Sequence, residues 1–358
     1  MFEKLTELLD SFLENGIPGY DCVVYHKGEC VYRHMNGYSN FENKVTMTGN
    51  ELYNIYSASK MITCTAALML WEKGLYDLED DLSLYLPEFK EMYVRTENGV
   101  QKAKNSIKIK NLFCMTAGLT YHLDLPQIKK CQEETEGRCP TRELVRYLAK
   151  EPLFFEPGGR YEYSLCHDVL AALVEEISGM RFGEFVRQNI FEPLDMKNST
   201  FLLDDSQIEK VSCQYAFDTE LKRIVECPKT IMYKLGTEYE SGGAGCITTL
   251  EDYIKFLEGL RTEKLLKVET IELMSTNQLT DKQLENYWVE GAGYGLGVSC
   301  SRKKGDNTDF GWGGAAGAYP IVDLKREISF FYIQHVLNTN CDSRNTPMRE
   351  YVRKHFFE

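Results

Sequence analysis

Strand-like runs at both ends of this chain enclose a long helical middle, and this order limits the folds open to it. Runs rich in β-branched and aromatic residues cover 20–26 and 29–34, and a two-residue turn typical of a hairpin joins them. After Gly243 the chain becomes strand-rich again, with runs at 294–300, 309–312, 318–323 and 327–334. This order predicts an α+β fold in which both termini contribute to one antiparallel sheet flanked by helices, with a large, mainly helical insertion beside it.

The same change of pattern divides the chain into two predicted units. Residues 1–56 and 235–358 are expected to form the sheet unit and residues 57–234 the mainly helical unit, with the active site between them. Helix patterns occur at 1–10, 142–150, 168–178, 182–189, 250–260 and 348–357.

The composition and charge of the chain limit the kinds of partner that it can bind. The 358 residues are 43% hydrophobic, which is enough for a large core, and no run approaches the roughly 20 apolar residues of a membrane span. The N-terminus lacks the basic start and apolar core of a signal peptide, so we expect a cytoplasmic protein whose twelve cysteines are reduced thiols. A net charge of −13 argues against nucleic acid and anionic membranes. Neither the cysteines nor the six histidines cluster at ligand spacing, so no metal or other cofactor is expected.

The tetrad Ser57-Ala58-Ser59-Lys60 stands at the start of a predicted helix, whose apolar run ends at Gly74. Residues three apart share one face of a helix, so the Lys60 amine can reach the Ser57 hydroxyl. Burial and the positive end of a helix dipole both disfavour an ammonium group. A neutral lysine beside a serine hydroxyl is a general base beside a nucleophile, which makes Ser57 the candidate nucleophile.

The tetrad alone has other interpretations. A helix cap with a solvated lysine would show the same four residues. A second copy, Ser301-Arg302-Lys303-Lys304, precedes Gly-Asp-Asn, a pattern typical of a charged surface turn.

Six further motifs follow the tetrad. Together, and in this order, they resemble those of the class C β-lactamase-like serine hydrolases. This family includes class C β-lactamases, D-alanyl-D-alanine carboxypeptidases and family VIII carboxylesterases, and Ser-x-x-Lys is one of its catalytic signatures. The six motifs are TAGL at 116–119, EPGGRYEYS at 156–164, FEPLDM at 191–196, SGGAG at 241–245, YGLG at 294–297 and FGWGG at 310–314. The resemblance covers nearly the whole chain and implies a β-lactamase/transpeptidase-like fold.

The resemblance implies a serine acyl hydrolase that works through an acyl-enzyme on Ser57. Lys60 would be its base or proton relay, and Tyr163 matches the family's catalytic tyrosine. Which of the two takes the proton is left open. Tyr38-Ser39-Asn40 spells the tyrosine motif more literally, but it precedes Ser57 and follows the N-terminal hairpin, so we interpret it as unrelated.

The glycines of the FGWGG motif imply an oxyanion hole. Gly313 and Gly314 let their strand pass close to the substrate, so the backbone N–H of Ala315 can act together with that of Ser57. A phosphate-binding loop is the poorer interpretation of these glycines, because no Lys-Ser/Thr and no helix follow them.

Two departures from the family pattern bear on the substrate. Leu165 stands where the family has an asparagine that holds an acyl-amide side chain, and Trp312 replaces the lysine that neutralises a substrate carboxylate. Both changes remove polar contacts, so we expect an esterase or amidase acting on small molecules. The alternatives are a β-lactamase or D-alanyl-D-alanine carboxypeptidase and a non-catalytic binding member of the fold. The oligomeric state is left open.

Overall fold

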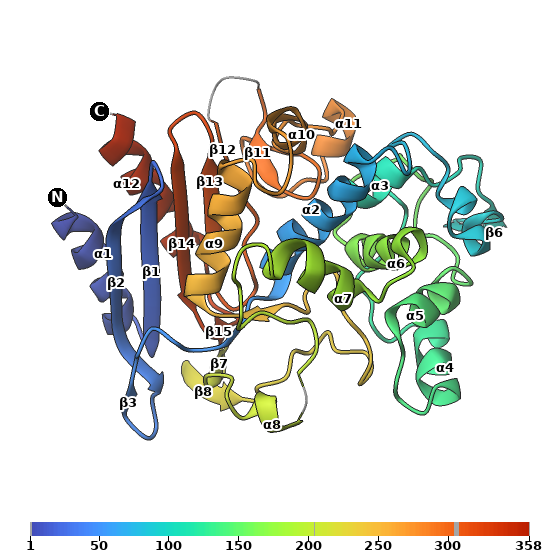
Figure 1. The fold of residues 1–358 in the computed structure, drawn as a ribbon. Helices are drawn as coiled ribbons and strands as arrows, with labels where there is room; N and C mark the ends of the chain where they lie inside the picture. Colours follow the sequence, from blue (N-terminus) through green and yellow to red (C-terminus); the bar gives the residue numbers. More distant parts are fainter. Residues whose placement is uncertain (1, 204, 304–307, 358) are drawn as a thin grey trace.

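Both termini meet in one antiparallel sheet, which confirms the predicted fold class (Figure 1). The structure is a computed structural model that describes residues 2–203, 205–303 and 308–357, without the side chains of 205, 206, 356 and 357. Strand β1 (Gly19–His26) pairs with β14 (Ile328–Gln334), so that Val24 lies opposite Phe330. The sheet order is β12-β13-β14-β1-β2-β3. The other four strands are β2 (Glu29–Asn40), β3 (Val45–Thr46), β12 (Asp309–Phe310) and β13 (Tyr319–Asp323).

Side chains of the central strands alternate between the two faces of the sheet, and both faces are buried because helices cover them. On one face, Tyr20 and Val24 pack with helices α1 (Glu3–Glu14) and α12 (Asp342–Phe357). On the other face, Phe331 packs with Tyr253 of helix α9 (Leu250–Arg261), with ring centroids 4.5 Å apart. Figure 1 shows α9 lying across the sheet on the side opposite α1 and α12. The face of the sheet that α9 covers is therefore turned toward the helical part of the molecule.

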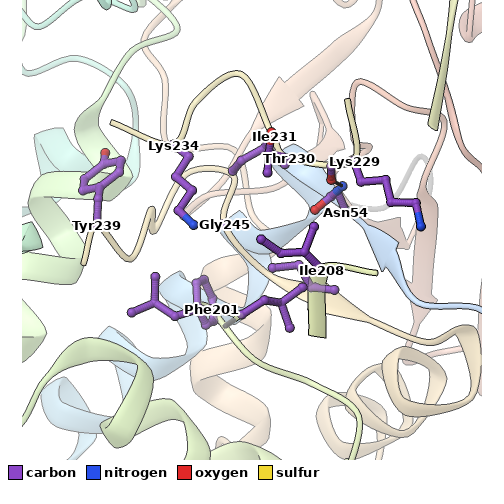
Figure 2. Close-up of a pocket in the computed structure, with 12 residues that line it drawn as sticks. Asn54, Phe201, Ile208, Lys229, Thr230, Ile231, Lys234, Tyr239 and Gly245 are labelled. Atoms are coloured by element: carbon purple, nitrogen blue, oxygen red, sulfur yellow. Dashed lines mark hydrogen bonds between the residues drawn. The ribbon is translucent and has the colours of Figure 1, made fainter. Parts of the chain in front are cut away.

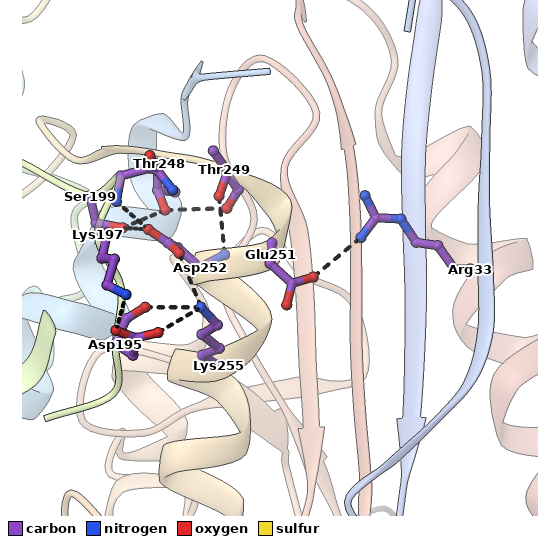
Figure 3. Close-up of polar contacts among 10 residues, drawn as sticks. Arg33, Asp195, Lys197, Ser199, Thr248, Thr249, Glu251, Asp252 and Lys255 are labelled. Atoms are coloured by element: carbon purple, nitrogen blue, oxygen red, sulfur yellow. Dashed lines mark hydrogen bonds and ion pairs between the residues drawn. The ribbon is translucent and has the colours of Figure 1, made fainter. Parts of the chain in front are cut away.

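Polar contacts fix the start of α9 to its neighbours (Figure 3). Thr249 is the N-cap, and its side chain accepts the backbone N–H of Asp252. Asp252 in turn accepts the Ser199 hydroxyl at 3.1 Å. Glu251 lies 3.9 Å from Arg33, which belongs to β2. The helix is therefore tied both to the sheet and to the helical region.

Helix α2 (Ser59–Glu72) runs through the middle of the molecule and is buried on almost every side, as a helix without a polar face must be. It packs against α6 (Cys166–Ser178). As predicted, the left-handed Gly74, with φ +70°, follows its last residues. The other helices of this region are α3 (Ile109–Phe113), α4 (Pro126–Glu134), α5 (Thr141–Leu148), α7 (Phe182–Val186) and α8 (Asp205–Ile208).

Short elements complete the fold. A hairpin of β5 (Tyr93–Thr96) and β6 (Gly99–Lys102) projects from the helical region, and β4 (Tyr53–Asn54) pairs with β9 (Ile247–Thr248). Helices α10 (Val268–Met274) and α11 (Asp281–Leu284) follow α9.

Three sequence predictions differ from the structure. The run 294–300 is not one strand but turns at Gly297, with φ +88°, into the hairpin of β10 (Ala292–Tyr294) and β11 (Ser299–Ser301). The last helix begins at Asp342 and not at 348, since Pro347 is accommodated within it. The middle of the chain also contains strands β7 (Gln214–Asp218) and β8 (Arg223–Cys227), and β7 pairs in parallel with β15 (Val336–Leu337). How the chain divides into two units stays a prediction.

Candidate active site

Ser57 lies in a tight 3₁₀ turn, Tyr56–Ala58, between β4 and the start of α2. Tyr56 has a φ of +48°, which is unfavourable for a bulky residue and is typical of strained functional turns. Neighbouring groups hold this turn in place: the Ser59 hydroxyl donates to the Tyr56 carbonyl at 2.6 Å, and the Tyr253 hydroxyl donates to the Ala58 carbonyl at 2.9 Å. The serine is therefore presented by a rigid backbone.

The structure brings Ser57 together with three of the other predicted residues. The Tyr163 hydroxyl donates to Ser57 Oγ at 2.6 Å, and Lys60 Nζ donates to the same Oγ at 3.3 Å. Trp312 Nε1 donates to the Tyr163 hydroxyl at 3.1 Å. A nucleophile within hydrogen-bond reach of a base is the arrangement that activates a serine.

Lys60 is completely buried, and its amine has three acceptors. Besides Ser57 Oγ, these are the Gly243 carbonyl at 2.6 Å and the Tyr121 hydroxyl at 3.3 Å. These three contacts fix the position of the amine beside Ser57. Burial, together with the charge of Asp168, raises the pKa of Tyr121 well above its usual value, so this phenol stays protonated.

Backbone hydrogen bonds join the segments around the TAGL and EPGGRYEYS motifs and thereby place Tyr163. The Glu162 N–H donates to the Met115 carbonyl at 2.9 Å, and the Leu165 N–H donates to the Thr120 carbonyl at 3.2 Å. The Leu165 side chain is only 2% exposed and packs in the apolar core. It does not line the cleft described below, so the structure does not bring Leu165 to the site predicted for it.

Gly314 allows the irregular segment between β12 and β13 to approach the turn that contains Ser57. A Cβ at this position would lie 2.1 Å from the Ile55 carbonyl oxygen, which no side chain could tolerate. The Gly314 N–H donates to the Ala318 carbonyl at 2.7 Å. Gly313 and the exposed Ala315 line the same cleft as Ser57.

The cleft has a volume of about 720 Å³ and two chemically different parts. Near Ser57 its walls are aromatic, formed by the side chains of Tyr163, Tyr233, Trp288 and Trp312. The far part is lined by Arg349 and Arg353 of α12. Each donates to the buried Asp309 carboxylate at 2.6 Å, so the two guanidinium groups share one anionic partner.

Four residues of the site carry no sequence signal of their own. Tyr121, Tyr233 and Trp288 stand in no motif, and the chain has 22 tyrosines. For Asp168 the sequence indicates only the start of a helix. Tyr121 could have been suspected because it follows the TAGL motif by two residues, but that position has no spacing rule that points to a lysine contact.

Among the described residues, neither duplicate motif forms a second site. Tyr38-Ser39-Asn40 ends β2, where the Ser39 hydroxyl donates to the Val45 carbonyl of β3. In the second Ser-x-x-Lys copy Ser301 ends β11, whereas the predicted turn falls on 304–307, outside the described residues.

A separate pocket of about 40 Å³ lies beside Gly245 (Figure 2). Its lining includes Phe201, Ile208 and Lys234 but not Ser57, Lys60 or Tyr163.

Within the described part of the chain, histidine, cysteine and acidic side chains form no group of three that could hold a metal ion. None of the helices that the structure describes is long and apolar enough to cross a membrane.

Comparison with known proteins gives a consistent result. A family profile described as Beta-lactamase matches residues 3–351. The chain is 27% identical to the esterase EstB of Burkholderia gladioli, over 96% of this chain and 92% of that protein. The structure of EstCE1, described as a hydrolase with promiscuous acyltransferase activity, matches with a TM-score of 0.81 at 23% identity and covers 98% of this chain and 97% of that chain. Simvastatin synthase LovD from Aspergillus terreus matches with a TM-score of 0.81 at 21% identity, over 99% of this chain and 98% of that one. These two solved structures share the fold of the whole chain.

Proposed function

The chain belongs to the beta-lactamase family of serine hydrolases, and we propose that it forms an acyl-enzyme on Ser57 and acts as an esterase or amidase on small molecules. The observation that carries the proposal is the contact of Ser57 Oγ with both the Tyr163 hydroxyl, at 2.6 Å, and the amine of the buried Lys60, at 3.3 Å. The relative named an esterase, EstB, supports the same reaction class.

In the proposed reaction Ser57 Oγ attacks the substrate carbonyl and its proton passes to the Lys60–Tyr163 pair. The two groups are coupled, so the proton acceptor is a property of the pair. The same pair then returns the proton to the leaving alcohol or amine. Water repeats the sequence on the acyl-enzyme and releases the acid.

The developing oxyanion would be bound by the backbone N–H groups of Ser57 and Ala315, which line the same cleft. The close approach of Gly314 to Ile55 supports this role, because it brings the two backbone segments together.

The cleft favours esters over β-lactams. Trp312 occupies the place of the family's lysine, and the arginines at the far end, Arg349 and Arg353, are already paired with Asp309. Among the described residues that line the cleft these two are the only cations, so a substrate carboxylate beside Trp312 would have no cationic partner in a partly dry site, which is costly. The aromatic wall beside Ser57 suits an apolar acyl or alcohol group instead. The β-lactamase and carboxypeptidase alternatives are correspondingly less favoured, and the joined Ser57, Lys60 and Tyr163 disfavour a non-catalytic role.

The proposal is tested by covalent labelling with a fluorophosphonate probe or turnover of a p-nitrophenyl ester. We expect the wild type to be labelled and Ser57→Ala to be unreactive, because the nucleophile is removed without loss of core packing. The matched control is Ser39→Ala, which removes the serine of the unrelated Tyr-Ser-Asn copy on β2 and should leave the labelling of Ser57 unchanged. Labelling of Ser57→Ala at the wild-type rate would place the nucleophile elsewhere.

A further inference from the structure

Two buried groups that can carry opposite charge face each other across Gly243. The Lys60 side chain is fully buried, and Asp168, in the first turn of α6, is 1% exposed. Neither forms a salt bridge with any side chain in the described ranges, although an isolated buried charge is unfavourable.

The Asp168 carboxylate is hydrogen-bonded on one side only. Oδ1 accepts the Tyr239 hydroxyl at 2.5 Å, the Ser241 hydroxyl at 2.7 Å and the Gly243 N–H at 3.3 Å. Three donors on one oxygen suit an ionised carboxylate, which can only accept. Oδ2 is buried and has no hydrogen-bond partner among the described residues. An unpartnered buried oxygen requires a physical explanation.

The position of Oδ2 gives that explanation. A Cβ at Gly243 would lie 2.7 Å from Asp168 Oδ2, 2.9 Å from the Tyr121 hydroxyl and 3.3 Å from Lys60 Nζ. The carboxylate, the phenol and the amine therefore converge on one Cα, and only glycine leaves room for them. Gly243 also links the two buried groups through its backbone, because its N–H donates to Asp168 and its carbonyl accepts from Lys60.

The other titratable groups around Lys60 do not supply a negative charge. They are Cys64 on α2, Cys166 and His167 on α6, and Tyr121 and Tyr163 on the loops. Burial raises the pKa of both thiols and of the Tyr121 phenol, and it lowers the pKa of the imidazole to about 3. These four groups are uncharged near neutral pH. Tyr163 is the relay partner itself, so Asp168 is left as the anion beside the pair.

We propose that Asp168 is a positioning residue that acts through Gly243 as the counter-charge of Lys60 and so holds the protons of the Lys60–Tyr163 pair more tightly. The inference rests on the proposed function, since it assigns a role within the Ser57 site. A negative charge favours the protonated form of both a lysine and a tyrosine, so its effect has one sign whichever of the two accepts the serine proton.

The test is the pH dependence of Ser57 labelling by a fluorophosphonate in the full-length protein. Asp168→Asn keeps the shape of the side chain and the acceptor at Oδ1 but removes the charge. In the plot of labelling rate against pH, one limb reports the titration of the Lys60–Tyr163 pair. We expect Asp168→Asn to move this limb to lower pH by about one unit or more, which is a tenfold change in labelling rate at a given pH on that limb. If Asp168→Asn does not fold, Asp168→Ser replaces it, and we expect the same shift of the limb to lower pH.

Two matched controls separate charge from structure. Tyr239→Phe and Ser241→Ala each remove one donor to Oδ1 and leave the carboxylate charged, so the limb should stay near its wild-type pH. A slower Asp168→Asn with an unmoved limb, or an equal shift in the two controls, would overturn the proposal. A wild type that shows no Ser57-dependent labelling would instead overturn the proposed function.

Discussion

The Tyr163 hydroxyl joins side chains that come from three distant parts of the sequence. It donates to Ser57 Oγ and accepts the indole N–H of Trp312, and its ring centroid lies 4.5 Å from Lys60 Nζ. Trp312 was predicted only as a substrate contact. In the structure it also orients the phenol, so a change at this residue has two separable effects.

We expect Lys60→Ala and Tyr163→Phe each to lower the acylation rate by about a thousandfold or more, because each removes part of one proton relay. The double mutant should be far less than additive, since the relay is already broken in either single mutant. Single-turnover acylation of a p-nitrophenyl ester measures all three variants. Fully additive losses would show that Lys60 and Tyr163 act independently.

At Trp312 we expect the wild type to prefer an ester over a chromogenic cephalosporin, as judged by kcat/KM. Trp312→Lys should move this ratio toward the cephalosporin, because a charge-assisted contact contributes roughly 1.5–3 kcal/mol, or on the order of ten- to a hundredfold. Trp312→Phe is the matched control: it removes the indole N–H without adding charge, so it should slow both substrates alike. Efficient cephalosporin turnover by the wild type would contradict this prediction. Leu165→Asn does not belong in the comparison, since this side chain is buried in the core.

At the scale of elements, the site depends on how closely the segment between β12 and β13 approaches the turn before α2. Gly314→Ala would place a Cβ 2.1 Å from the Ile55 carbonyl and force the two segments apart. We expect acylation to fall by about 10²–10³, the usual effect of losing one oxyanion donor. Gly313→Ala is the control, because its Cβ would lie 3.2 Å from the nearest backbone oxygen, that of Ala318, and should cost much less. Equal rates for the two variants would argue against an oxyanion hole at Ala315.

The segment 294–300 shows that a local sequence pattern can fail to predict an element. The 294–300 run was predicted as one strand because its alternation is strand-like, but a left-handed Gly297 folds it back on itself. The hairpin brings β11 next to the segment after β12, where the Ser299 N–H donates to the Gly311 carbonyl at 2.9 Å. The turn at Gly297 therefore supports the segment that carries Trp312. Its position depends on packing against that segment and not on the local sequence pattern.

At the scale of the whole molecule, His335 connects the main sheet to the smaller sheet that contains β7. It lies between β14 and β15, and its carbonyl accepts the Tyr215 N–H. Burial lowers the pKa of His335 from its usual value of 6.5 to about 4. Between these values the unfolded chain binds a proton that the folded protein does not, so the free energy of unfolding decreases as the pH falls.

We expect His335→Gln to flatten the dependence of unfolding free energy on pH. The wild type should lose about 1.4 kcal/mol per pH unit more than the variant as the pH falls from 6.5 toward 4. Denaturant unfolding at a series of pH values measures the difference. The control is His122→Gln, at an exposed position, whose curve of unfolding free energy against pH should run parallel to that of the wild type. Parallel curves for His335→Gln as well would show that this imidazole is not kept neutral by the fold.

The sequence by itself determined the sheet that both termini share, the helix that follows Ser57, and the Ser57–Lys60 pair at the centre of the site. The Ser57–Lys60 contact follows from a spacing of three residues at a helix start, and the shared sheet of β1 and β14 follows from strand patterns at both termini. Both are local or periodic properties of the chain. The ordered motifs also placed Tyr163 and the glycine strand by resemblance.

Tertiary structure decided what surrounds that pair. Tyr121 and Asp168 reach Lys60 and Gly243 through packing between segments that are far apart in the chain. Leu165, which sequence reasoning placed in the cleft, is instead buried. Residue type and spacing do not specify which of 22 tyrosines meets an amine or on which side of a loop a leucine lies, because these contacts form only when the helices and the sheet pack together.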